Sequence, residues 1–418
     1  MTYASHYECT LCGRTFPFDG VMTTCPSCGE TGILDIVYDY EAMKKTVTKA
    51  SFRENHDFSI WRYLPVLSIA GTRHEETLHT GWTPLYETKR LAEALGLKRL
   101  FVKDEGLNPT ASLKDRPSAV AVLDAIARGY DTVACSSTGN AASSLAGQAA
   151  RMGLHAVIFV PKRAPVGKLN QLLAYGATVI AVDGDYKAAF ALSKRAIAHY
   201  GWYDRNAAIN PHLVEGKKTV SLELAEQLGW DVPDWVVVSV GDGCTVAGVY
   251  KGFYDLFRLG ITPSIPRILG VQSSGCAPFV TASESGYPLV ECEENTIADS
   301  IAVGIPRNPV KAQRAIAQSN GAWIAVSDEA ILAMMKTLGS AEGIFGEPAG
   351  VAGLAGLKVA VAAKMIQPHE RVVVLMTGNG LKDPANAGKA VGSPALLKPD
   401  LQELIDYMKR KHDKGCVR

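Results

Sequence analysis

The chain has 418 residues, of which 47% are hydrophobic and 20% charged, and its formal net charge is +1. This is the composition of an ordinary soluble α/β protein, with enough chain for one large domain or two to three of usual size. A charge so close to neutral gives no reason to expect a nucleic acid or a membrane as a partner. The start is polar and no apolar run reaches transmembrane length, so the sequence predicts neither a signal peptide nor a membrane span.

The first forty residues carry two Cys-x-x-Cys pairs separated by twelve residues. The four cysteines are Cys9, Cys12, Cys25 and Cys28. Two such turns can surround one zinc ion tetrahedrally and leave no open coordination position, which is typical of a structural site. We therefore expect residues 1–40 to form a zinc-ribbon-like module, although docking on a larger body could keep the fold without metal. Thiols in this pattern also indicate a reducing compartment, and we expect the cytoplasm.

Short apolar runs alternate with amphipathic, helix-length segments from residue 81 to about residue 395, after a helical connector at residues 41–80. The expected strands are Leu100–Lys103, Thr132–Cys135, Ala156–Val160, Val179–Val182, Trp235–Val240, Ile268–Val271, Trp323–Val326 and Val372–Met376. Apolar strands that alternate with helices predict parallel sheets covered on both faces, with ligands at the carboxyl ends of the strands. The tail, Leu401–Lys411, is expected to be an exposed helix that serves packing or dimer formation.

A polar turn, Asn108–Arg116, runs directly into an apolar helix-like segment, Pro117–Arg128. Lys114 is thus expected at a helix N-terminus, where free backbone N–H groups make an ammonium group easier to deprotonate. A neutral lysine amine is the nucleophile that forms a Schiff base with an aldehyde cofactor. Because most Lys-Asp-Arg triplets are solvated charges, the other loops must support this interpretation.

The loop after the strand that ends at Cys135 has several polar residues before the next helix. It contains Ser137, Thr138, Gly139 and Asn140. Small hydroxyl residues, a glycine and an asparagine at a helix start offer several donors to a carboxylate or an oxyanion. A plain helix cap needs only one such residue, so the cluster favours an anion site.

Two further loops follow strands of the expected sheets. One consists of Gly241, Asp242, Gly243, Cys244 and Thr245. Glycines at a helix start can hold one phosphate, but Val246 stands where a dinucleotide fingerprint needs its third glycine. The other loop begins with Thr377, whose hydroxyl can bond a neutral ring nitrogen. With Lys114, these loops suit pyridoxal phosphate carrying an amino acid, which has an aldehyde carbon, a phosphate, a ring nitrogen and a carboxylate.

The motifs in these loops resemble a known family. Asn-Pro-Thr-x-Ser-x-Lys-Asp-Arg, Ser-Thr-Gly-Asn, Asn-Pro-x-x-x-Glu-Gly, Glu-Pro-Ala and Thr-Gly-x-Gly-Leu-Lys-Asp are similar to motifs of threonine synthase, a fold-type II pyridoxal-phosphate enzyme, over roughly residues 80–390. The resemblance implies a fold like the tryptophan synthase β subunit, with two open parallel-sheet domains. We expect a large domain at residues 81–130 and 206–395, a small domain at 131–205 and a C-terminal helix within 396–418.

The resemblance also implies a role for each loop. Lys114 would be the catalytic Schiff-base lysine, Gly241 to Thr245 would hold the cofactor phosphate, and Thr377 would face the pyridine nitrogen. The substrate would lie near Ser137, Thr138 and Asn140. Asn140 would also contact the 3-hydroxyl of the cofactor. A small amino acid is the expected substrate, and a homodimer is the expected assembly.

Departures from the family pattern bear on the substrate. Threonine synthase must hold the phosphate of O-phosphohomoserine, but here Ala141 and Ala208 replace hydroxyl residues, Leu213 replaces an arginine and Asp242 replaces an amide. Charge-assisted hydrogen bonds are worth roughly 1.5–3 kcal/mol each, so their loss would weaken phosphate binding by orders of magnitude. The leading hypothesis is therefore a lyase that performs α,β-elimination on a non-phosphorylated hydroxy amino acid, such as L-threonine or L-serine, giving a 2-oxo acid and ammonia.

Three alternatives stay open. The first is threonine synthase activity itself, with the phosphate site rebuilt from His212, Lys217 or another cation. The second is β-replacement, in which a second nucleophile adds after elimination. The third is a binding module without a cofactor, against which the intact Lys114 argues. If Asp242 faces the substrate, it could instead select a cationic side chain such as that of a diamino acid.

Overall fold

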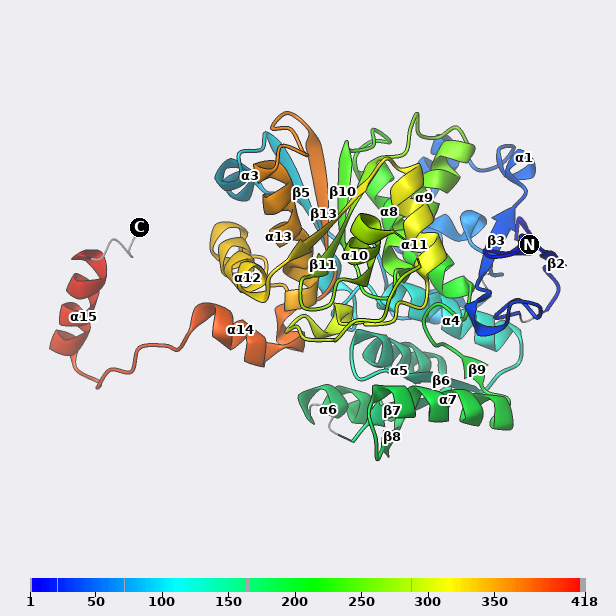
Figure 1. Ribbon diagram of the computed structural model, residues 1–418, viewed down its shortest axis with the longest axis horizontal. Coiled ribbons are helices and arrows are strands. Elements are labelled where there is room, and N and C mark those ends of the chain that lie inside the picture. Colours follow the sequence, from blue (N-terminus) through cyan, green and yellow to red (C-terminus); the bar gives the residue numbers. More distant parts are fainter. Residues whose placement is uncertain (1, 21, 71, 163–165, 287, 414–418) are drawn as a thin grey trace.

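The computed structural model describes residues 2–20, 22–70, 72–162, 166–286 and 288–413. Its strands form a three-stranded, a six-stranded and a four-stranded sheet. Figure 1 shows the six-stranded sheet at the centre, the four-stranded sheet below it and the three-stranded sheet of the N-terminus against one side. No helix in the described part of the chain is both long and apolar enough to cross a membrane.

The N-terminal sheet is antiparallel, with the order β2–β1–β3. Its strands are β1 (Ala4–Cys9), β2 (Thr15–Pro17) and β3 (Leu34–Tyr38). Alternate residues of β3 point to opposite faces, so Leu34, Ile36 and Tyr38 are buried. They belong to the same apolar cluster as helices that cover the six-stranded sheet. The N-terminal module therefore shares its core with the main body.

The six-stranded sheet has the order β12–β11–β10–β13–β5–β4, and every pair is parallel except the one that involves the edge strand β4. Its strands are β4 (Leu85–Glu87), β5 (Arg99–Asp104), β10 (Trp235–Ser239), β11 (Arg267–Ser273), β12 (Ala322–Val326) and β13 (Arg371–Met376). The central strands β10 and β13 are buried along their whole length, as continuous apolar runs predict.

Helices cover both faces of this sheet (Figure 1). One face carries α8 (His212–Gln227), α9 (Cys244–Arg258) and α11 (Pro309–Gln318). The other carries α3 (Lys89–Leu95), α12 (Asp328–Glu342) and α13 (Pro348–Ala362). Along β10, Val236 and Val238 pack into the cluster of the first face, and Val237 packs into that of the second. Both faces of the sheet are thus covered by apolar packing, and only the loops at the strand ends are left for a ligand.

The four-stranded sheet is parallel throughout, with the order β8–β7–β6–β9. Its strands are β6 (Thr132–Ser136), β7 (His155–Pro161), β8 (Thr178–Val182) and β9 (Tyr203–Asp204). Its helices are α4 (Asp115–Ala127), α5 (Asn140–Met152), α6 (Val166–Ala174) and α7 (Tyr186–Tyr200). The first two pack on one face and α7 packs on the other.

The connector at residues 41–80 is less helical than expected. After α1 (Tyr40–Met43) it contains α2 (Lys49–Glu54) and two 3₁₀ turns, at Ile60–Val66 and His74–Glu76. Pro65 lacks the N–H that an α-helix would need there. The remaining helices are α10 (Pro278–Ser285), α14 (Pro384–Val391) and α15 (Leu401–Asp413). Residues 414–418 of the expected tail lie outside the described residues.

Candidate active site

Loops from both parallel sheets meet at one cavity. It is lined by all the residues that the sequence predicted for the cofactor, namely Lys114, Asn140, Gly241, Asp242, Gly243, Cys244, Thr245 and Thr377. Ser137 and Thr138, expected near the substrate carboxylate, are half-buried on the loop before α5 and are not among the lining residues. The structure adds Arg205, Ala207, Lys217, Ser239, Ser300, Ile301, Glu347 and Ala349.

The loop that carries Lys114 is attached to the end of β13. The backbone N–H of Leu113 donates to the carbonyl of Thr377 (2.9 Å), and Ser112 pairs with Gly378 in an isolated antiparallel bridge. Lys114 itself is the residue from which α4 begins. These contacts place the lysine beside Thr377, although the two residues are far apart in the sequence.

The same loop is held in an uncommon conformation. Ala111 has a φ of 69°, which a residue with a side chain rarely adopts, and Asp115 fixes the turn by accepting from the N–H and the hydroxyl of Thr110. Burial, reinforced by the positive charge of Arg205, lowers the pKa of the Lys114 ammonium. A larger share of the amine is therefore neutral and able to act as nucleophile or base.

The glycine loop after β10 forms a cradle at the start of α9. Gly243 has a φ of 85°, and a Cβ there would lie 2.7 Å from the Cβ of Ala312 and 2.8 Å from the carbonyl of Asn308. Among the described residues, the backbone N–H groups of Gly241, Asp242 and Gly243 donate to no backbone acceptor outside a helix or strand. Free N–H groups at a helix N-terminus favour an anion, so this cradle suits a phosphate.

Arg205 is a cavity residue that the sequence did not reveal. It directly follows β9 and its side chain is 1% exposed. Its Nε and Nη2 donate to the hydroxyl of Ser118 (3.2 and 3.0 Å). No ion pair joins it to a carboxylate in the part of the chain that the structure describes. A buried charge without a counter-charge is destabilising by several kcal/mol, which is expected of a group that binds an anionic ligand.

Lys217 is a second buried cation in the cavity. Its Nζ donates to the carbonyl of Leu213 (3.3 Å), and it forms no ion pair among the described residues. Burial lowers the pKa of Lys217 to about 7. Near Lys217, α8 packs closely against α9. A Cβ added to Gly248 of α9 would lie only 2.6 Å from the Cβ of Lys217. The lysine thus lies against the helix that begins at the glycine loop.

Two residues that the sequence proposed as modifiers of the substrate site have other partners. Asp242 lies 3.6 Å from the Arg307 guanidinium and also accepts from the backbone N–H of that residue, so Arg307 balances its charge. His212 is buried, with Nδ1 2.8 Å from the hydroxyl of Ser68 and Nε2 3.4 Å from that of Tyr7. It faces the N-terminal module and does not line the cofactor cavity.

Asn140 and Glu347 join the two sheets across the cavity. The amide Nδ2 of Asn140 donates to Oε1 of Glu347 (2.7 Å), which is 2% exposed and precedes α13. The backbone N–H of Glu347 in turn donates to the carbonyl of Gly378. The Gly-Glu-Pro-Ala motif could have identified this carboxylate, but a plain helix cap explained it equally well from the sequence.

These groups fit pyridoxal phosphate. Lys114 offers an amine with a lowered pKa, and the glycine loop offers backbone N–H groups that donate to no backbone acceptor among the described loops. Within the described residues the hydroxyl of Thr377 has no hydrogen-bond partner of its own, so it is available to a ring nitrogen. Lys114 would bind the aldehyde of the cofactor, the glycine loop its phosphate and Thr377 its pyridine nitrogen.

Comparison with known proteins identifies the family of this chain. The model of the family described as pyridoxal-phosphate dependent enzyme matches residues 76–378. A threonine synthase from Methanosarcina acetivorans is 39% identical over 402 residues, which cover 96% of this chain and 97% of the relative. A threonine synthase from Methanocaldococcus jannaschii is also 39% identical, over 405 residues that cover 96% of this chain and 99% of the relative.

Solved structures share the fold. Diaminopropionate ammonia lyase from Escherichia coli matches with a TM-score of 0.68 at 21% identity, over 82% of this chain and 92% of that one. Threonine deaminase isoform 2 from Solanum lycopersicum matches with a TM-score of 0.65 at 22% identity, over 75% and 88%. The expected α/β fold of a fold-type II enzyme is thus confirmed. The chain belongs to the pyridoxal-phosphate dependent enzyme family and is a homologue of threonine synthases over nearly its whole length.

Proposed function

We propose that this enzyme acts on a phosphorylated amino acid and releases inorganic phosphate, as threonine synthase does when it converts O-phosphohomoserine to L-threonine. The observation that carries the proposal is the pair of buried cations, Arg205 and Lys217, that line the cavity without a carboxylate partner among the described residues. The names of relatives that are 39% identical support the same activity. In this proposal other residues replace the phosphate donors that the sequence lacks, and threonine synthase activity is preferred to elimination.

We assign the two cations to different phosphates. Lys217 lies against α9, whose first turn belongs to the glycine loop, so it complements the phosphate of the cofactor. The charge of Arg205 is close enough to Lys114 to lower the pKa of that amine, and we assign Arg205 to the side where the substrate reacts. A guanidinium holds a phosphate through two parallel hydrogen bonds, and this geometry suits the leaving group of the substrate.

The residues of the chain divide the chemical work. When bound, pyridoxal phosphate withdraws electrons from the substrate and so stabilises negative charge on its carbon atoms. Lys114 is proposed to remove and return protons at those carbons, because its amine is neutral more often than that of an exposed lysine. Thr377 would accept or donate only through a neutral hydroxyl, so it leaves the ring nitrogen unprotonated. Arg205 would neutralise the charge that grows on the departing phosphate.

A side-by-side assay of the cofactor-loaded enzyme tests this function. O-phospho-L-homoserine, L-threonine and L-serine are supplied separately, and inorganic phosphate, threonine, 2-oxo acid and ammonia are measured. We expect equal amounts of phosphate and threonine from the phosphorylated substrate. Oxo acid and ammonia from L-threonine or L-serine, with no phosphate released from O-phospho-L-homoserine, would restore the elimination hypothesis. Phosphate release with 2-oxo acid and ammonia in place of threonine would indicate that elimination follows the loss of phosphate.

We also propose that the four N-terminal cysteines bind one structural zinc ion. Their sulfur atoms all lie within 4.8 Å of one another, and the Sγ atoms of Cys12 and Cys25 are 3.8 Å apart. Zinc–sulfur bonds of about 2.3 Å in a tetrahedron place the sulfurs about 3.8 Å apart, which agrees with that spacing. Metal analysis should find one zinc per chain, and a Cys12→Ser variant should lose it. Reduced thiols are consistent with the cytoplasm as the proposed location.

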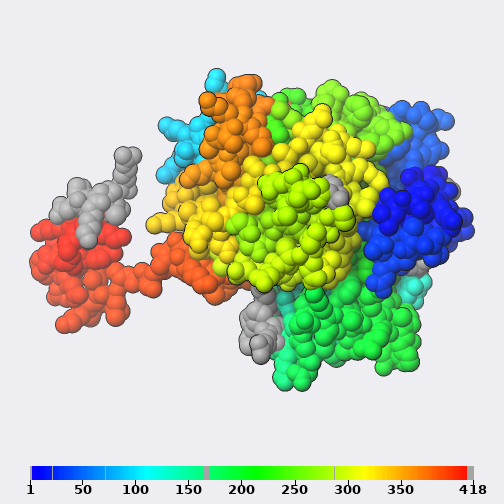
Figure 2. All heavy atoms as spheres, viewed as in Figure 1, coloured from blue at the N-terminus to red at the C-terminus, as the bar shows by residue number. Residues whose placement is uncertain are grey.

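The C-terminal helix supports a homodimer as the proposed assembly. Figure 2 shows α15 standing away from the body on an extended linker. Leu401, Leu404, Ile405 and Met408 lie on it at helical spacing, and each is at least 37% exposed. Such an apolar stripe is usually buried, and a second copy of the chain provides the partner. Removal of residues 393–418 should shift the molar mass from that of a dimer to that of a monomer in light scattering.

A further inference from the structure

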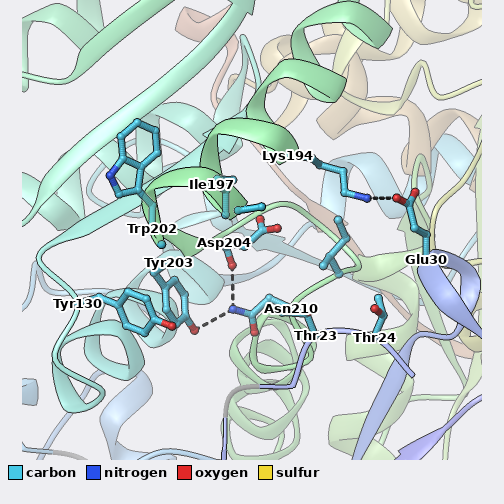
Figure 3. A pocket seen from close by; sticks show the side chains of 13 residues that line it. Thr23, Thr24, Glu30, Tyr130, Lys194, Ile197, Trp202, Tyr203, Asp204 and Asn210 are labelled. Carbon is cyan, nitrogen blue, oxygen red and sulfur yellow. Dashed lines mark hydrogen bonds and ion pairs between the residues drawn. The ribbon is translucent and has the colours of Figure 1, made fainter. Parts of the chain in front are cut away.

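A second cavity is lined by residues of the N-terminal module and of the four-stranded sheet (Figure 3), and it shares no lining residue with the cofactor cavity. Its volume is about 340 Å³. Thr23, Thr24 and Glu30 line it from the N-terminal module, and Lys194 and Trp202 line it from α7 and the turn that follows. Ligand pockets are typically about 300–1,000 Å³, so this one suits a small molecule rather than a nucleotide cofactor.

Four polar side chains on the wall of this cavity have no hydrogen-bond partner among the described residues, whereas the Asn210 amide at its floor is bonded. The side chains without a hydrogen bond to another described residue are those of Thr23, Thr24, Tyr130 and Trp202. At the floor, the amide of Asn210 donates to the hydroxyl of Tyr203 (2.8 Å) and to the carbonyl of Asp204 (3.0 Å), as Figure 3 shows. The wall therefore retains donors and acceptors for a ligand, and the floor is already rigid.

Charges of both signs surround the same space. Lys194 forms an ion pair with Glu30, which is 82% exposed, and Asp204 also lines the cavity. Two carboxylates and one ammonium would repel a polyanion but can hold a molecule that carries one charge of each sign. Ile197 and Trp202 add an apolar wall. The chemistry matches a zwitterion with an apolar side chain.

We propose that this cavity is a binding site for a free L-amino acid with an apolar side chain. Lys194 holds the α-carboxylate, Glu30 and Asp204 hold the α-ammonium, and the side chain packs on Ile197 and Trp202. The ligand displaces the exposed ion pair between Lys194 and Glu30, which contributes little to stability because water screens it. It also joins the N-terminal module to the four-stranded sheet.

Binding at this cavity is coupled to the active site through two backbone segments. Asp204 directly precedes Arg205, and Asn210 lies just before α8, which carries Lys217. Because these segments are already rigid, a ligand that shifts Asp204 or Asn210 also shifts the adjoining cavity cation, and so changes the affinity of the active site for anions. Coupling of this kind is reciprocal, so an anion changes the affinity for the amino acid by the same factor. The coupling, unlike the binding site, rests on the proposed roles of Arg205 and Lys217.

Calorimetry on the full-length, cofactor-loaded enzyme tests the site directly. L-leucine, L-isoleucine, L-methionine and L-phenylalanine are titrated, and the cofactor absorbance is followed to separate this binding from binding at Lys114. We expect at least one of them to bind at millimolar concentration or below without a change in absorbance. Leucinamide and N-acetyl-L-leucine, which each lack one charge, should fail to bind. Equal binding of either analogue, or no binding of any of the four amino acids, would overturn the proposal.

A matched pair of lysine variants locates the site. Lys194→Met should weaken binding at least about tenfold, because it removes a charge-assisted hydrogen bond. Lys187→Met changes an exposed lysine on the same helix that pairs with Glu291 outside this cavity, and it should bind as the wild type does. Equal loss in both variants would refute the assignment. Sulfate binding to the cofactor-free enzyme, measured with and without the amino acid, tests the coupling, and an unchanged sulfate affinity would refute the coupling while leaving the site intact.

Discussion

Among the buried cations that the structure describes in the main body, two groups differ in their partners. The first group contains Lys103 and Arg116, which are bonded to Glu105 and Glu223 in a network whose side chains are all fully buried. The second contains Arg205 and Lys217, which have no carboxylate partner among the described residues and line the cofactor cavity. Loss of one partner of such a buried pair destabilises a fold, and we propose that the unpaired cations are retained because a ligand supplies the counter-charge.

Substitution of Lys114 should have the largest effect on catalysis and a small effect on the fold. Its amine lines the cavity and has a lowered pKa. We expect Lys114→Ala to lower kcat by at least about 10³-fold, because proton transfer by a positioned group contributes about 10²–10⁴-fold and the covalent attachment is lost as well. The cofactor absorbance should change to that of free aldehyde. Retained turnover would remove Lys114 from the catalytic role.

Glu223→Gln should have the largest effect on stability. Burial alone would raise the pKa of this carboxyl, but Arg116 and Lys103 outweigh burial and lower the pKa from 4.5 to about 2. Breaking a buried pair is destabilising by about 3–5 kcal/mol, and urea unfolding at neutral pH should show that loss. The stabilisation is present above pH 4.5 and disappears as the pH falls towards 2, so wild type and variant should converge there. A difference that is independent of pH would contradict the charged pairing.

Arg205→Met should weaken substrate binding without destabilising the fold, in contrast to Glu223→Gln. It removes an unpaired buried charge, so the cofactor-free protein should be as stable as the wild type or more stable. The KM for O-phospho-L-homoserine should rise by about 10- to 100-fold, because a charge-assisted bond worth roughly 1.5–3 kcal/mol is lost. Arg116→Met is the matched control, since it should destabilise the fold. Equal stability losses in the two arginine variants would end the distinction between the two groups.

The smallest expected effect is a pH dependence of anion binding. Burial lowers the pKa of Lys217 to about 7, so this lysine is positively charged below pH 7 and loses its charge above it. Sulfate keeps its charge over this range, and its affinity for the cofactor-free enzyme should fall by about tenfold from pH 6 to pH 8. Lys217→Arg stays charged and should show a flat profile. A flat profile in the wild type would exclude Lys217 from the anion site.

The sequence predicted the parts of the site that depend on strand ends. Parallel strands bring their carboxyl ends to one edge, so Lys114, Thr377 and the glycine loop were expected together, and the structure places them around one cavity. Arg205 was missed because β9 is only two residues long and gives no apolar run. The partner of Asp242 was missed because Arg307 is far along the chain. The contact between Cys276 and Cys292, whose Sγ atoms are 3.8 Å apart, was also missed, because no sequence motif joins the two residues.

The most direct test of a phosphorylated substrate is a calorimetric titration of the cofactor-loaded enzyme with inorganic phosphate. The cradle at Gly241 to Thr245 is then occupied by the cofactor, so any remaining phosphate site belongs to the substrate. We expect one site per chain in the wild type and none in Arg205→Met, with the cofactor absorbance unchanged in both. Absence of phosphate binding in the wild type, or undiminished binding in the variant, would contradict a phosphorylated substrate held by Arg205.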